Sequence, residues 1–127
     1  FKENIEELYQ LGAASIHPEN KFKNFEKVQV KVEKLDNILI NNIGFIKIDV
    51  EGHELEVIEG AKKTITKNKP ILLIEIEKRH SKRPVEETIA RIGNLKYDCF
   101  FVKDNDLISV KKLNNMNLVN NFFFLPK

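Results

Sequence analysis

The sequence has 127 residues, enough for one domain with a substantial core. It carries 21 basic and 19 acidic residues, and the net charge of +2 is too small to indicate nucleic acid or an anionic membrane as a partner. No apolar run approaches the roughly 20 residues of a membrane-spanning helix, and no signal-peptide pattern is present. A single cysteine excludes a disulfide framework. We expect a cytoplasmic protein that is not inserted in a membrane.

The first part of the chain predicts one short helix and two strands. Residues 3–11, ENIEELYQL, fit a short helix, and the polar segment that follows is irregular. In residues 27–35, KVQVKVEKL, valines alternate with polar residues, which indicates a strand with one covered face. DNILINN then makes a brief helix or turn. Residues 44–50, GFIKIDV, are almost continuously apolar, which is typical of a strand covered on both faces.

The segment 54–67 predicts an amphipathic helix. Leu55, Ile58, Ala61 and Ile65 recur on one face, with acids in the first turn and lysines toward the end, an order that suits the helix macrodipole. Gly60 is unfavourable by about 1 kcal/mol relative to alanine in a helix interior. We expect it to allow a close approach of the helix to the sheet.

The second half repeats the alternation and then adds strands. PILLIEIE at 70–77 is a strand, and PVEETIARIGNL at 84–95 is a helix that begins at a proline. YDCFFV, DLISV and NFFFLP are three further strands. The asparagine-rich segment LNNMNLVNN, between the second and the third, is expected to be a surface loop. This order predicts an α/β fold with a mostly parallel sheet, helices on both faces and an antiparallel C-terminal edge. Residues 45–50 and 71–76 are expected to be adjacent parallel strands.

Pairs of acids end two of the predicted strands. Asp49 and Glu51 follow one, Glu75 and Glu77 end the next, and His80 lies three residues further on. Side chains two apart on a strand share a face, and ligands of such sheets bind at the carboxyl ends of the strands. We therefore expect four carboxylates along one edge of a cleft. The structural alternative is that these acids cap helices or pair with Lys47, Lys78 or Arg79.

Three chemistries fit such a rim. Phosphoryl transfer needs a glycine-rich phosphate loop, which is missing because the glycines stand far apart at 12, 44, 52, 60 and 93. A divalent metal would accept the four carboxylates as oxygen ligands, but their spacing does not demand one, and we assign no metal ligand. Transfer of a group to a hydroxyl needs a general base, for which an acid, His53 or His80 would serve.

The residues around these acids resemble a known family. FIKIDVEGHELEVIEGAKKTI, followed by KPILLIEIE, is similar to the core of the FkbM-type methyltransferases. The upstream VQVKVEKLDNIL and the closing NFFFLPK resemble the flanks of that core. The resemblance implies a Rossmann-like fold that binds S-adenosylmethionine and transfers its methyl group, usually to an oxygen of a sugar, a lipid-linked glycan or a secondary metabolite.

In that family's fold the cofactor lies on a glycine-rich loop after the first strand, and an acid at the end of the second strand holds its ribose. This sequence contains neither, so we assign no cofactor-binding residue. Residues 1–127 are expected to be a single domain, the C-terminal portion of a catalytic domain whose N-terminal strands are missing.

Within this chain we expect two catalytic residues, Asp49 and Glu51, and a small-molecule or glycan acceptor. The residues expected to bind that acceptor are His53, Glu75, Glu77 and His80. The competing hypothesis is a non-catalytic α/β module that binds or interacts through half of the fold. The sequence specifies neither the acceptor nor the oligomeric state.

Overall fold

The computed structural model describes residues 29–80 and 83–127. The chain divides into two units, Phe1–Lys31 and Val32–Lys127, and the sheet with all described helices belongs to the second. The helix expected at 3–11 lies outside the described residues. That residues 1–127 form a single domain stays a prediction.

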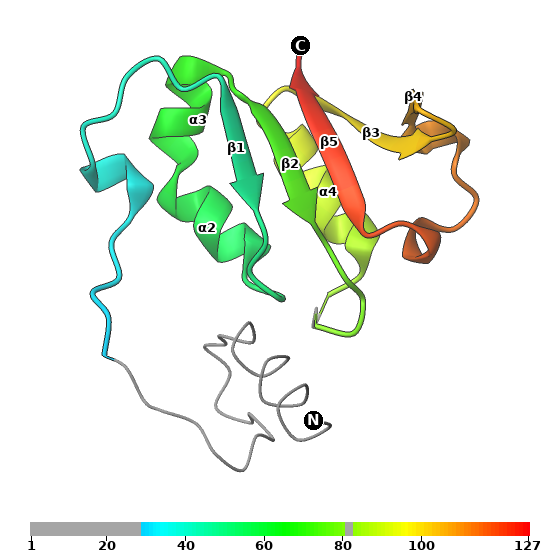
Figure 1. The fold of residues 1–127 in the computed structure, drawn as a ribbon, viewed down its shortest axis with the longest axis horizontal. Coiled ribbons are helices and arrows are strands. Elements are labelled where there is room, and N and C mark those ends of the chain that lie inside the picture. Colours follow the sequence, from blue (N-terminus) through cyan, green and yellow to red (C-terminus); the bar gives the residue numbers. More distant parts are fainter. Residues whose placement is uncertain (1–28, 81–82) are drawn as a thin grey trace, which may run out of the picture. The chain divides into compact units, whose positions relative to one another are not determined.

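The second unit is a five-stranded mixed sheet with three α-helices and short 3-10 turns (Figure 1). The strand order is β1-β2-β5-β3-β4, in which β1 and β2 are parallel and every other pair is antiparallel. In chain order the elements are η1 (Leu35–Asn37), β1 (Phe45–Ile48), α2 (Glu54–Gly60), α3 (Lys62–Asn68), β2 (Ile71–Glu75), α4 (Val85–Gly93), β3 (Tyr97–Lys103), β4 (Asp106–Ser109), η2 (Val110–Lys112), η3 (Met116–Leu118) and β5 (Asn121–Pro126).

The predicted parallel pair is confirmed, with Ile48 of β1 opposite Ile74 of β2. The three late strands are confirmed as well, and β5 inserts between β2 and β3, so that Phe124 lies opposite both Leu72 and Cys99. The strand ends of β1 and β2 therefore meet at one edge of the sheet, which is the arrangement that the acid pairs required.

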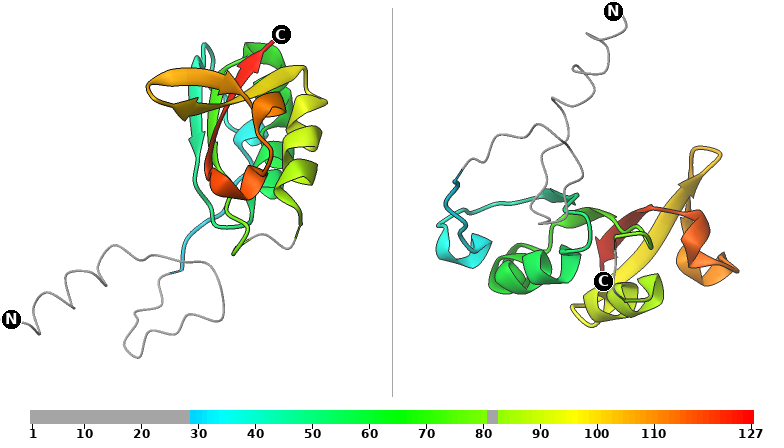
Figure 2. Two further views of the ribbon diagram at one scale, coloured as in Figure 1. Left: turned by 90° about the vertical axis from the view of Figure 1, so that its right-hand side faces the viewer. Right: turned by 90° about the horizontal axis from the view of Figure 1, so that it is seen from below.

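In the part of the chain that the structure describes, the three α-helices lie on one face of the sheet (Figure 2). The expectation of helices on both faces is not met there. The expectation of a mostly parallel sheet is also wrong within the described residues, because β1 and β2 form the one parallel pair beside three antiparallel pairs. Burial follows the alternation of the strands, because every second residue faces the helices. The core between the two layers contains Ile48, Leu72, Ile74, Phe122 and Phe124 from the sheet, Ile58, Ile65, Val85 and Ile92 from the helices, and Ala61 from the junction of α2 and α3.

The opposite face of the sheet carries apolar side chains that are partly exposed. Phe45 is 53% exposed and its register partner Ile71 is 39% exposed, whereas Val102 and Leu107 pair at the far side with exposures of 52% and 50%. The prediction that residues 44–50 form a strand covered on both faces is therefore wrong within the described residues. We call this surface the open face.

The strand predicted at 27–35 is wrong over the residues that the structure describes. Residues 29–34 form no strand, and Val30 and Val32 are 68% and 88% exposed. Residues 27 and 28 lie outside the described range. Alternating valines become a strand only where a neighbouring strand accepts their backbone hydrogen bonds and a layer covers their side chains. The turn expected after this segment is present as η1.

The predicted helix at 54–67 is divided into α2 and α3 at Ala61, whose φ of −117° is not helical. No local side chain caps the start of α3. Asp36 of η1 does so instead, because its carboxylate accepts the N–H groups of Lys63 at 3.0 Å and Thr64 at 2.9 Å. The three atoms nearest to a Cβ on Gly60 would all belong to Lys34, at 3.6–3.9 Å, and none to the sheet. The expectation that Gly60 allows a close approach to the sheet is therefore wrong.

Candidate functional site

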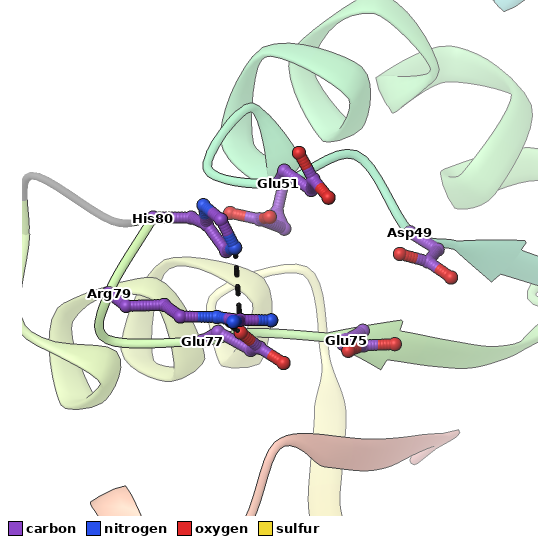
Figure 3. Close-up of a pocket in the computed structure, with 7 residues that line it drawn as sticks. Asp49, Glu51, Glu75, Glu77, Arg79 and His80 are labelled. Atoms are coloured by element: carbon purple, nitrogen blue, oxygen red, sulfur yellow. Dashed lines mark hydrogen bonds and ion pairs between the residues drawn. The ribbon is translucent and has the colours of Figure 1, made fainter. Parts of the chain in front are cut away.

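A small cavity lies at the carboxyl ends of β1 and β2 (Figure 3). Its volume is about 30 Å³, roughly the share of one water molecule. The structure brings both predicted acid pairs to this cavity. The residues that line it are Asp49, Glu51, Glu54, Glu75, Glu77, Arg79 and His80.

Asp49 is accessible in this cavity although it forms an ion pair. Its Oδ2 lies 3.1 Å from Nζ of Lys47, and the two side chains are 45% and 55% exposed. Lys47 and Asp49 share a face because they are two residues apart in an extended segment. An exposed pair of this kind contributes little to stability. Asp49 therefore remains available to a ligand, as the sequence predicts.

Glu75 and Glu77 differ in their protonation behaviour. Burial, the charge of Asp49 and a hydrogen bond with Glu77 raise the pKa of Glu75 above its ordinary value. The hydrogen bond from Nε of Arg79 is the main cause that lowers the pKa of Glu77. Glu77, whose side chain is only 14% exposed, also accepts a hydrogen bond from Nδ2 of Asn120. Glu75 is thus the carboxyl group of this pair that holds a proton more readily.

The turn between β1 and α2 has an uncommon backbone. Glu51 has a φ of 47° and Gly52 a φ of 94°, both in the left-handed region that L side chains rarely adopt. The N–H of Gly52 donates to Oε1 of Glu54 at 2.7 Å, and Glu54 is only 4% exposed. A helix normally takes its cap from the preceding residue, but His53 makes no side-chain capping bond.

The two predicted histidines are placed differently. His80 lines the cavity, and its Nε2 lies 3.6 Å from Oε2 of Glu77 (Figure 3). His53 precedes α2 and is not among the lining residues. Arg79 and Glu54 line the cavity without having been predicted as site residues. Their signals in the sequence are an arginine two residues after the second acid pair and an acid two residues after the strand-end glycine.

A family model described as the methyltransferase FkbM domain matches residues 5–101. The chain belongs to the FkbM methyltransferase family. The resemblance of the strand-end motif is thereby confirmed, and the α/β sheet is compatible with a methyltransferase-like fold. No curated protein and no solved structure matches the chain.

Membership of the FkbM methyltransferase family suggests a methyltransferase and implies S-adenosylmethionine as the typical methyl donor. The cavity does not fit this cofactor. A pocket for a ligand of that size has a volume of about 300–1,000 Å³, and the cavity has about 30 Å³. It also presents carboxylates where a dinucleotide-type site presents a glycine loop and backbone N–H groups. The described residues of the site therefore do not enclose the methyl donor.

A larger groove of about 480 Å³ lies between α2 and α4, away from the strand ends. Its floor contains Leu55, Ile58 and Leu95, and charged side chains surround it. Two of these form an ion pair, in which Nη1 of Arg83 lies 3.9 Å from Oε1 of Glu56. None of the residues that line this groove lines the cavity at the strand ends, so the groove is not part of the acid-lined site.

Two further observations concern the described residues alone. None of their helices has the length and apolar content that a membrane crossing requires. Among residues 29–80 and 83–127, no group of three or more histidine, cysteine or acidic side chains is arranged to hold a metal ion.

Proposed function

We propose that this chain is the C-terminal portion of a Rossmann-like, S-adenosylmethionine-dependent methyltransferase domain that methylates a hydroxyl group of a sugar, glycan or secondary metabolite. The match to the FkbM domain over residues 5–101 carries the proposal. It does not favour the alternative of a non-catalytic binding module. The cytoplasm remains the proposed location.

The one-sided sheet supports the view that more of the domain is needed. Parallel strands usually occur in sheets that are covered on both faces, because the connections between them place helices there. Here β1 and β2 are parallel, yet Phe45 and Ile71 on the open face are 53% and 39% exposed. In the described part of the chain, β1 is also an edge strand, which pairs only with β2. A second layer and further strands would complete this sheet.

In O-methylation the acceptor oxygen would form a bond to the methyl carbon as the bond from that carbon to the donor's sulfur breaks. The hydroxyl would lose its proton, so a base beside it would lower the barrier. Asp49 is the best candidate for this base. Glu77 is held by Arg79 and Asn120 and is therefore less free to accept the hydroxyl proton. Asp49 has a 45% exposed side chain at the mouth of the cavity.

The other lining residues would bind hydroxyl groups of the acceptor from the opening of the cavity, because a volume of about 30 Å³ does not enclose a sugar. Glu75 and His80 lie on the β2 side of the cavity and offer hydrogen bonds to further hydroxyl groups (Figure 3). Glu51, in the turn after β1, would orient the acceptor beside Asp49. His53 is not part of this set in the structure, and its predicted role in substrate binding has no support from the cavity.

The experiment compares this chain with a protein that also contains the residues encoded upstream of it. Isothermal titration with S-adenosylmethionine is expected to detect binding by the longer protein and none by the 127 residues alone. The missing glycine loop and ribose acid account for this difference. Micromolar binding by the chain alone would show that the cofactor site lies inside it and would overturn the half-domain assignment.

The catalytic role is tested in the longer protein with Asp49→Asn. This nearly isosteric change should lower turnover by about 10²–10⁴-fold, the usual contribution of a general base, while cofactor affinity changes little. Asp98→Asn is the matched control, because Asp98 also lies 3.1 Å from a lysine, Lys127, with a side chain that is 48% exposed, far from the cavity. Equal turnover in both variants would remove Asp49 from the mechanism.

A further inference from the structure

The two loops that carry the acid pairs touch through their backbones. The turn after β1 places Gly52 directly against His80 in the loop after β2. A Cβ at position 52 would lie 2.3 Å from the carbonyl oxygen of His80 and 3.0 Å from its carbonyl carbon. Contacts this short do not occur for real Cβ atoms, so any side chain at this position would push the loops apart. The φ of 94° at Gly52 adds a second reason why only glycine fits.

A buried carboxylate holds Gly52 in this conformation. Glu54 is the first residue of α2, and its Oε1 accepts the Gly52 N–H at 2.7 Å. It is 4% exposed although it carries an ionisable group, and buried acids are rare unless a partner satisfies them. A hydrogen bond to a charged acceptor contributes more than one between neutral groups. The hydrogen bond from Gly52 to Glu54 therefore stabilises the turn between β1 and α2 and not only the start of α2.

We propose that Glu54 is a positioning residue that acts through Gly52 to hold the two loops at the separation that gathers Asp49 and Glu75 in one site. The effect on methyl transfer rests on the proposed function, whereas the effect on the geometry of the carboxylates does not. Glu54 exchanges no proton with the substrate in this role. Glu54 keeps the turn after β1 in contact with His80. The position of this turn then limits where Asp49 lies.

Glu75 reports on this geometry without an activity assay. The groups that face it are Asp49 and Lys47 from the β1 side, Glu77 and Arg79 from its own loop, and its register partner Asn121 from β5. Burial and the charge of Asp49 are the two largest causes of its raised pKa. If the loops separate, water enters and Asp49 moves away. Both changes would lower the pKa of Glu75 toward its ordinary value.

The test titrates the Glu75 carboxyl carbon by NMR in the 127-residue chain. Glu54→Leu removes the acceptor with little change in size, and the Glu75 titration is expected to move to lower pH. Glu54→Gln keeps an acceptor oxygen, so the titration should stay close to that of the unmodified chain. An unchanged Glu75 titration in Glu54→Leu would overturn the proposal, as would an equally large change in Glu54→Gln.

Hydrogen exchange of the unmodified chain keeps the test decisive if Glu54→Leu fails to fold. The Gly52 amide, bonded to a buried carboxylate, should exchange at least about tenfold more slowly than a free amide in a turn. Exchange at the free rate would overturn the proposal. In the longer protein, Glu54→Leu should lower kcat by about 100-fold, the effect of a misplacement near 1 Å, with a smaller change in KM. If the longer protein shows no methyl transfer at all, the proposed function fails while the NMR result still decides the role of Glu54.

Discussion

Two adjacent phenylalanines in β5 test the one-sided core. Phe124 is fully buried between Leu72 and Cys99, its register partners on β2 and β3. Phe123 faces the other way and is half-buried on the open face, beside Leu73 and Phe100. Phe124→Ala should cost about 3–5 kcal/mol, the usual loss for a buried phenylalanine. Phe123→Ala should cost about 1 kcal/mol, roughly half of the 1.5–3 kcal/mol that full burial contributes.

Urea unfolding followed by circular dichroism measures both variants. With a slope of about 1–3 kcal/mol/M, Phe124→Ala should lower the midpoint by more than about 1 M and Phe123→Ala by less. A domain of this size is stable by about 5–15 kcal/mol, so Phe124→Leu is the milder substitute if the alanine variant does not fold. Equal losses at the two positions would refute the reasoning, because they would show that the open face is covered as well as the core.

Two further variants test the helix break and the acid pair. Gly60→Ala should raise stability by up to about 1 kcal/mol in the same urea assay, since its Cβ would meet Lys34 at an ordinary 3.6 Å; a loss would mean that the backbone there needs glycine. Glu75→Gln should make the protein more stable at pH 7. The folded state binds the Glu75 proton more tightly than the unfolded state, so stability falls as pH rises from the ordinary value of 4.5 through the raised pKa. The gain in stability from Glu75→Gln should vanish below pH 4. Thermal melts measured across pH test this, and a gain that persists below pH 4 would contradict it.

The elements that the sequence predicts well are those whose pattern is local. The strands β2, β3 and β5 and the helix α4 follow from apolar runs and from the proline before α4, and the meeting of the acid pairs follows from the parallel order of β1 and β2. The strand expected at 27–35 and the uninterrupted helix at 54–67 depend on distant partners. Asp36, for example, caps α3 from 27 residues away.

The role of Glu54 is also beyond a sequence pattern. An acid in the first turn of a helix is explained by the macrodipole alone, and that explanation is complete until the backbone is known. Only the positive φ of Gly52 and its contact with His80 show that the carboxylate turns back toward the strand. The same holds for the open face, because an apolar strand does not reveal whether one or two layers cover it.

The position of β5 determines when the sheet can close during synthesis. β2 ends at Glu75 and β3 begins at Tyr97, yet these strands do not pair with each other, because β5 lies between them. The ribosome must therefore release Asn121–Pro126 before the parallel half and the β3–β4 hairpin can join. Until then both halves of the sheet have unpaired strand edges, which are prone to aggregate. A premature stop codon ahead of Asn121 would leave the preceding residues without β5 and therefore with unpaired strand edges.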